Sequence, residues 1–99
     1  MIDAIKQVTG DSNDVFVIDF YANWCNPCKK LDISLKNIRK DFKDVKFKKI
    51  NVEIESELSN LFDVRSIPTL LFIKNNKIEE RLVGAINEDL LTETIDKLI

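Results

Sequence analysis

The sequence predicts an α/β fold in which a central sheet is covered by helices on both faces. Two observations predict it: helix-like and strand-like segments alternate along the chain, and the strongly apolar run 15–22 has no polar face. A strand that is apolar on both sides belongs in the centre of a sheet that lies between helices. Since 99 residues, 44% of them hydrophobic, suffice for one core and not for two, we expect a single domain over residues 1–99.

The first half of the chain predicts two helices and two strands. Apolar residues spaced by three near the N-terminus indicate a short helix that ends at Gly10, and a turn follows over 11–14. After the strand at 15–22, a helix is expected from about Pro27, because a proline in the first turn lacks only an N–H that would have no partner. Segment 45–52 then alternates as a strand does. The buried stripe of the long helix is expected to comprise Leu31, Leu35, Ile38 and Phe42.

The second half predicts a short helix, a hairpin and a final helix. Ser56 is a candidate N-cap for the short helix, and the apolar run 70–73 indicates the next strand. Asn75 and Asn76 tolerate positive φ, so a tight antiparallel hairpin should lead into a strand over 78–83. Asn87 is expected to cap the last helix. The result is a sheet of four strands.

The two cysteines of the chain, Cys25 and Cys28, stand directly behind the first strand, in the stretch Trp24-Cys25-Asn26-Pro27-Cys28. If a helix begins there, Cys25 lies at the positive end of the helix dipole, where a thiolate is favoured over a thiol. Such a site exchanges electrons with disulfides, with Cys25 as the nucleophile and Cys28, one turn further and more buried, as the resolving thiol.

Two other interpretations of this pair are weaker. A disulfide kept only for stability would close a very short loop and contribute roughly 2 kcal/mol in the chain-entropy model. A zinc site would lack two of its four ligands, because the chain has two cysteines and no histidine. No metal is therefore expected.

Charge and composition limit the expected partners. The formal net charge of −2 supplies no basic field for phosphates, so neither nucleic acid nor an anionic membrane is expected to bind. The first six residues carry charges and no apolar core of a signal peptide, which predicts a cytoplasmic protein. Because thiols in that compartment are kept reduced, a permanent structural disulfide is not expected there. The cysteine pair is instead expected to cycle between the dithiol and the disulfide.

Asp19 is unusual because its carboxyl group falls in the middle of the apolar run. Burial disfavours the charged form, so its pKa should be raised. Lys49 shares the parity of Val45 and Phe47, which places it on an apolar face from which it could reach Asp19. A partly exposed aspartate without a role and a lysine that extends to solvent are the alternatives.

Three segments together resemble the thioredoxin family. The stretch from Val17 to Lys29 is similar to the family's active-site block, the stretch from Arg65 to Leu70 to its proline loop, and Val83-Gly84-Ala85 to a third block. The resemblance extends from about Asp14 to the C-terminus in the same order and spacing, which is more specific than one cysteine pair. It implies a thioredoxin fold with a central mixed sheet. That sheet would have four strands, or five if an N-terminal edge strand is also present.

The resemblance also implies roles for particular residues. Cys25 and Cys28 would cycle between a dithiol and a disulfide, and Asp19 would lie beneath Cys28 and exchange a proton with it. The Ile67-Pro68 bond would be cis, leaving the backbone of Ile67 open to an extended substrate segment. An ordinary trans proline at the start of a strand is the alternative. The rim around the sulfur atoms would consist of Trp24, Ile67, Gly84 and Ala85, although Trp24 could also pack in the core.

The implied activity is that of a protein disulfide reductase without a cofactor. Its partners would be disulfide-containing client proteins and a thioredoxin reductase that recharges it, and it would act as a monomer. Asn26 stands where the family has glycine, and because Asn26 and Pro27 lie between the cysteines they bear on the reduction potential. Two alternatives are a disulfide oxidase or isomerase of the same fold, and a non-catalytic binding module.

Overall fold

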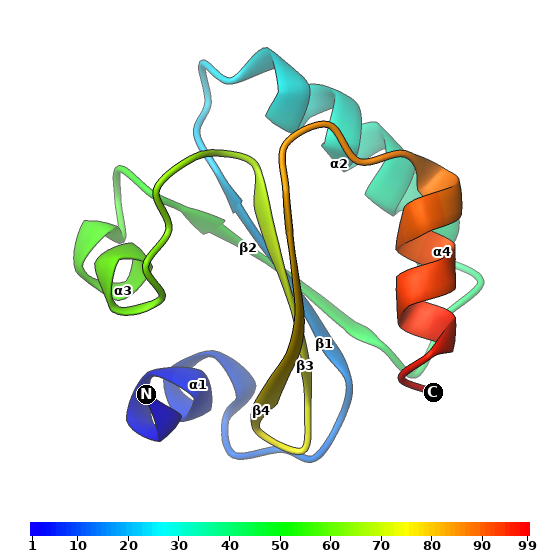
Figure 1. Cartoon of the computed structure of the whole chain (residues 1–99), viewed down its shortest axis with the longest axis horizontal. Helices are drawn as coiled ribbons and strands as arrows, with labels where there is room; N and C mark the ends of the chain where they lie inside the picture. Colours follow the sequence, from blue (N-terminus) through cyan, green and yellow to red (C-terminus); the bar gives the residue numbers. More distant parts are fainter.

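The computed structural model describes residues 1–99, which form four helices and four strands (Figure 1). The alternation of helices and strands that the sequence predicts is confirmed. In chain order the elements are α1 (Ile2–Thr9), β1 (Phe16–Tyr21), α2 (Asn26–Arg39), β2 (Lys46–Asn51), α3 (Ser56–Leu61), β3 (Thr69–Lys74), β4 (Lys77–Val83) and α4 (Glu88–Asp96).

The four strands form one mixed sheet in the order β2-β1-β3-β4, without a fifth strand. β1 runs parallel to β2, with Asp19 beside Lys49, and antiparallel to β3, with Asp19 beside Leu70. β3 and β4 are antiparallel. The C-terminal ends of β1 and β4 and the N-terminal end of β3 therefore meet at one end of the sheet, where the loop into α2 and the loop between β4 and α4 also lie (Figure 1).

Helices cover both faces of the sheet, as predicted for an apolar central strand. α2 and α4 lie against one face, and α1 and α3 lie against the other (Figure 1). The core under α2 and α4 includes Val17, Leu31, Leu35, Leu70, Phe72, Leu91 and Ile95. The core under α1 and α3 includes Ile5, Phe16, Ile18, Phe20, Phe62 and Leu71. Each face of β1 is therefore packed against its own set of helices, which fixes the strand that precedes the cysteines.

Turns and caps follow the predicted chemistry. Gly10 ends α1 with a φ of 65°, and Asn75 and Asn76, with φ of 53° and 57°, connect β3 to β4. The left-handed conformation favours glycine and asparagine, so both predictions are confirmed. None of the helices combines the length and the apolar character that are needed to cross a membrane.

Two details of the helices differ from expectation. Glu55, not Ser56, occupies the N-cap of α3, and its side chain makes no capping hydrogen bond. α2 ends at Arg39, so Phe42 packs against the core from the turn beyond the helix instead of extending its stripe. Both differences concern the ends of helices, which sequence patterns locate only to within a few residues.

Asn87 begins α4 as predicted, because its side chain accepts a hydrogen bond from the amide of Leu90 at 2.9 Å. Replacing Asn87 with alanine is expected to lower the free energy of unfolding by about 1 kcal/mol, since that amide loses its partner. Urea denaturation measures this change. Asn87→Asp should retain most of the stability, and Asn13→Ala, in an exposed loop, is the matched control that should change little.

Candidate active site

Cys25 and Cys28 form a disulfide at the start of α2. Cys25 is the N-cap of this helix, and its Sγ accepts a hydrogen bond from the backbone amide of Cys28 at 3.2 Å. Pro27 stands in the first turn, where its missing N–H has no cost. The predicted placement of the Cys25 sulfur at the N-terminal end of the helix is therefore observed.

The predicted contrast in burial between the two cysteines is not observed. Cys25 is 4% exposed and Cys28 is 3% exposed. In the disulfide both sulfur atoms are held in the same small cluster, which includes Ala22 and against which Ile67 packs.

The loop before β3 closes the site from the other side. The Ile67-Pro68 peptide bond is cis, as the family resemblance implied. Ile67 packs against the cysteine cluster, and the carbonyl of Pro68 accepts a hydrogen bond from the amide of Gly84 at 2.9 Å. The proline loop, the cysteines and the start of the β4–α4 loop thus belong to one region, although they lie far apart in the sequence.

Trp24 is not a core residue. Its exposed fraction is 67%, the second highest among the large hydrophobic side chains of the region from β1 to β4. An indole that solvent reaches to this extent gains little from packing, so core packing does not explain its presence beside Cys25.

Asp19 is buried in β1 as predicted, with 1% of its surface exposed. Neither of its carboxyl oxygens has a hydrogen-bond partner. Burial raises the pKa of Asp19 to about 6; the charge of Lys49 acts against this rise and the charge of Asp32 adds to it. The carboxyl group therefore changes its protonation state close to neutral pH.

Lys49 lies beside Asp19 in the sheet, but its ammonium group binds a different carboxylate. Lys49 Nζ is 3.1 Å from Asp32 Oδ1 and 4.3 Å from the centre of the Tyr21 ring. The second oxygen of Asp32 is 3.1 Å from Lys36 Nζ. Lys49 thus forms an ion pair with Asp32 of α2 and not, as expected, with Asp19. Its ammonium group acts on Asp19 only through its charge, without direct contact.

Asp32 was not predicted as a site residue from the sequence. Partial burial opposes ionisation of its carboxyl group, but hydrogen bonds and charge from Lys36 and Lys49 outweigh this effect and lower its pKa. One signal was available: Asp32 follows Cys28 by four residues, so it lies on the same face of α2 as a buried cysteine.

A small cavity of about 150 Å³ lies beside Cys28 and the ion pair of Asp32 with Lys49. Its lining includes Cys28, Lys29, Asp32, Lys49 and Tyr21. Cys28 thus lines an opening on the side of α2 that faces β2.

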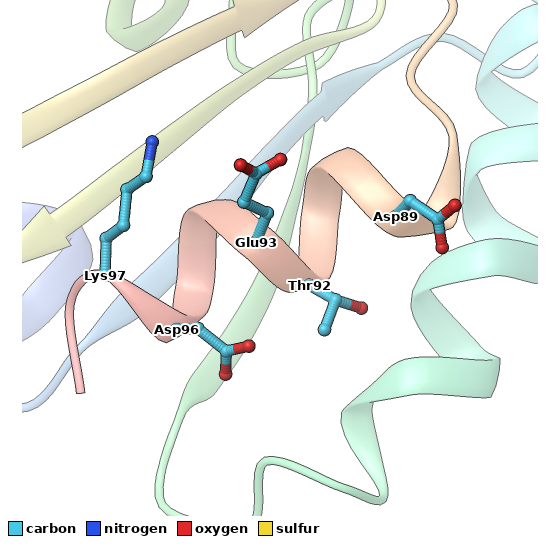
Figure 2. Close-up of a pocket in the computed structure, with 5 residues that line it drawn as sticks. All are labelled: Asp89, Thr92, Glu93, Asp96 and Lys97. Carbon is cyan, nitrogen blue, oxygen red and sulfur yellow. The ribbon is translucent and has the colours of Figure 1, made fainter.

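A second hollow, of about 430 Å³, lies on α4 and is shown in Figure 2. All of its lining side chains come from α4 or its C-cap, and they are Asp89, Thr92, Glu93, Asp96 and Lys97. None is a thiol, and no cluster of three metal-binding side chains occurs in the structure. Redox chemistry is therefore assigned to the end of the sheet that carries the cysteines.

Comparison with known proteins agrees with this site. The family model described as Thioredoxin matches residues 3–97. The chain belongs to the thioredoxin family. It is 38% identical over 84 residues to the thioredoxin of Mycoplasmoides gallisepticum, a match that covers 85% of this chain and 84% of that protein. Thioredoxin-1 of Drosophila yakuba is 37% identical over 100 residues, which cover 100% of this chain and 92% of the relative.

A solved structure of the thioredoxin family has the same fold. The thioredoxin of Fasciola hepatica superimposes with a TM-score of 0.86 at 33% identity, covering 98% of this chain and 92% of that one. With the Cys25–Cys28 disulfide at the start of α2, the chain is a thioredoxin-type dithiol–disulfide oxidoreductase.

Proposed function

We propose that this oxidoreductase works as a reductase of protein disulfides, with Cys25 as the nucleophile. One observation supports this assignment above all: the amide of Cys28 donates a hydrogen bond to Cys25 Sγ at the N-terminus of α2. Amide donors and the helix dipole favour a thiolate at that sulfur once the disulfide is reduced. The other sulfur has no such donor.

The proposed reaction has two exchanges. The Cys25 thiolate attacks one sulfur of a client disulfide, forming a mixed disulfide and releasing the other client sulfur as a thiolate, which takes up a proton. Cys28 then loses its proton and attacks the sulfur of Cys25, which closes the Cys25–Cys28 disulfide and releases the second client thiolate. Two electrons pass to the client, and a reductase restores the dithiol. Asn26 and Pro27, between the two cysteines, bear on the reduction potential.

Asp19 is proposed as the group that accepts the proton of Cys28. Its carboxyl group lies on the face of β1 that α2 covers, has no hydrogen-bond partner, and has a pKa of about 6. A base whose pKa lies near the working pH is effective in proton transfer. Lys49 would support this step electrostatically.

The proposed client surface surrounds the sulfur atoms. It consists of the exposed Trp24, the half-buried Ile67 and Gly84, the buried Pro68 and the exposed Ala85. A groove of about 440 Å³ between the first turns of α2 and the β4–α4 loop includes Pro27 and Ala85 in its lining. An extended client segment could lie along this surface and form backbone hydrogen bonds with the proline loop.

Membership of the family implies client proteins and a reductase as partners. We propose that the reductase is a thioredoxin reductase, that the 99 residues work as a single domain and a monomer, and that no cofactor is bound. We propose a cytoplasmic location, although some relatives act elsewhere: one is named a chloroplastic thioredoxin, of Spinacia oleracea, and another a mitochondrial thioredoxin, of Saccharomyces cerevisiae.

Covalent trapping tests the assignment of the two cysteines. Cys28→Ser should accumulate mixed disulfides with client proteins through Cys25, because the second exchange cannot occur. Non-reducing electrophoresis and mass spectrometry of the adducts would measure this and identify the clients. Cys25→Ser is the matched control and should form few adducts. Adducts that form mainly through Cys28 would contradict the assigned order of attack.

A further inference from the structure

Asp32 lies between two lysines that come from different elements. Lys36 belongs to the same helix and forms an i,i+4 pair with it, whereas Lys49 reaches it from β2. The two oxygens of the carboxylate are used separately, each 3.1 Å from one ammonium group. An ordinary surface pair on a helix would involve only Lys36. The pair with Lys49 therefore needs its own explanation.

Without Asp32, the nearest carboxyl group on the neighbouring strand is that of Asp19. Asp19 and Lys49 are direct partners in the parallel pairing of β1 and β2, so their side chains share the face of the sheet under α2. The contact with Asp32 and the Tyr21 ring, 4.3 Å from Nζ, instead holds the ammonium group near the surface, where the lysine side chain is 48% exposed. Neither oxygen of Asp19 has a hydrogen-bond partner.

We propose that Asp32 is a positioning residue: by holding the Lys49 ammonium group against α2, it keeps the Asp19 carboxyl group unpaired and free to take up and release a proton. The inference rests on the proposed function in one respect, because it gives this proton to Cys28. The small cavity that is lined by Cys28, Asp32 and Lys49 places the ion pair and the resolving sulfur around the same opening.

The charged groups around Asp19 predict the direction in which the pKa of Asp19 changes when Asp32 is removed. Lys49 faces it from β2, and α2 contributes Asp32, its partner Lys36, and Cys28. Tyr21 follows Asp19 by two residues on the same face of β1, whereas β3 and α4 contribute Leu70, Phe72, Leu91 and Ile95 to the core there, none of which carries a charge. The charge of Lys49 lowers the pKa of Asp19 and that of Asp32 raises it. Removing Asp32 should therefore lower the pKa of Asp19 for two reasons: a negative charge is lost, and Lys49 is released toward Asp19.

The test is a carboxyl ¹³C NMR titration of Asp19 in the oxidised protein, in which neither cysteine titrates. Asp32→Asn is expected to lower the midpoint of Asp19 from about 6 by roughly 1 pH unit. In a Lys49→Met background the same substitution should produce less than half of that shift, because there is no ammonium group to release. Lys36→Met should leave the midpoint in place.

Two results would overturn the proposal: an Asp19 midpoint that Asp32→Asn does not lower, or an equal decrease with and without Lys49, which would make Asp32 a remote charge and no more. Asp44→Asn, at an exposed turn, controls for net charge, and urea denaturation verifies that each variant is folded. The titration alone decides the role of Asp32. Insulin reduction followed against pH tests the separate assignment of Asp19: if Asp19 serves Cys28, the acid limb of the rate profile should move with the NMR midpoint.

Discussion

Cys25→Ser is expected to reduce the rate of insulin disulfide reduction to that of dithiothreitol alone. A serine hydroxyl at the N-cap of α2 is not ionised at neutral pH and is a poor nucleophile toward disulfides, so the first exchange cannot start. The fold should persist, because serine is itself a favoured N-cap residue and can accept the amide hydrogen bond that Cys25 Sγ now accepts. The assay is the increase in turbidity as the insulin chains separate.

The control for this loss is Cys28→Ser, which removes the same disulfide. Both variants should lose a similar roughly 2 kcal/mol of stability relative to the oxidised protein, since each opens the same short loop. A difference between them in client trapping must then come from chemistry and not from folding. Turnover by Cys25→Ser above the dithiothreitol rate would contradict a nucleophilic role for this cysteine.

Asp19→Ala is expected to make the folded protein more stable at pH 7 and to slow turnover. The pKa of Asp19 is raised from 3.8 to about 6 in the fold, so ionisation destabilises the folded state progressively between these two values and by a constant amount above them. This shift corresponds to about 3 kcal/mol at pH 7, and the packing that alanine loses offsets about 1 kcal/mol of the gain. Turnover should slow because Cys28 loses its proposed proton acceptor.

Urea denaturation of Asp19→Ala and of the unaltered protein between pH 3.5 and pH 8 measures this effect. The advantage of the variant should be absent at the acid end, where the carboxyl group is protonated in both states, and should reach its full size above about pH 6. Asp44→Ala, which removes an exposed carboxylate, should show no such dependence. A variant that is less stable than the unaltered protein at pH 7 would show that the buried carboxylate does not destabilise the fold.

The elements that were predicted correctly are those whose signals are local. Continuous apolar runs located β1 and β3, and alternation located β2. Residues tolerant of positive φ located the turn at Asn75 and Asn76, which leads into β4. Asn87 could be assigned as a cap because its partner, the amide of Leu90, lies three residues away. The proline loop could not be derived in this way, and its cis bond was implied only by the family resemblance.

The features that were missed depend on contacts between elements. Lys49 was placed on the correct face, but its partner depends on how α2 lies across β2, which no local pattern encodes. Trp24 was left undecided between the core and the rim, because composition does not show which side of the loop faces solvent. The burial of Cys25 was underestimated because a sequence does not show how the disulfide holds both sulfur atoms in one cluster.

The position of β2 at the edge of the sheet affects how copies of the protein associate. With four strands, the outer side of β2 offers unpaired backbone groups to any extended chain that approaches. Lys46 and Lys48 are exposed along this strand, and Lys48 Nζ also donates a hydrogen bond to the carbonyl of Val8 at 2.8 Å. An incoming strand would have to dehydrate these cations, so the same lysine-rich sequence that makes β2 an atypical strand also protects the protein from aggregation through its sheet.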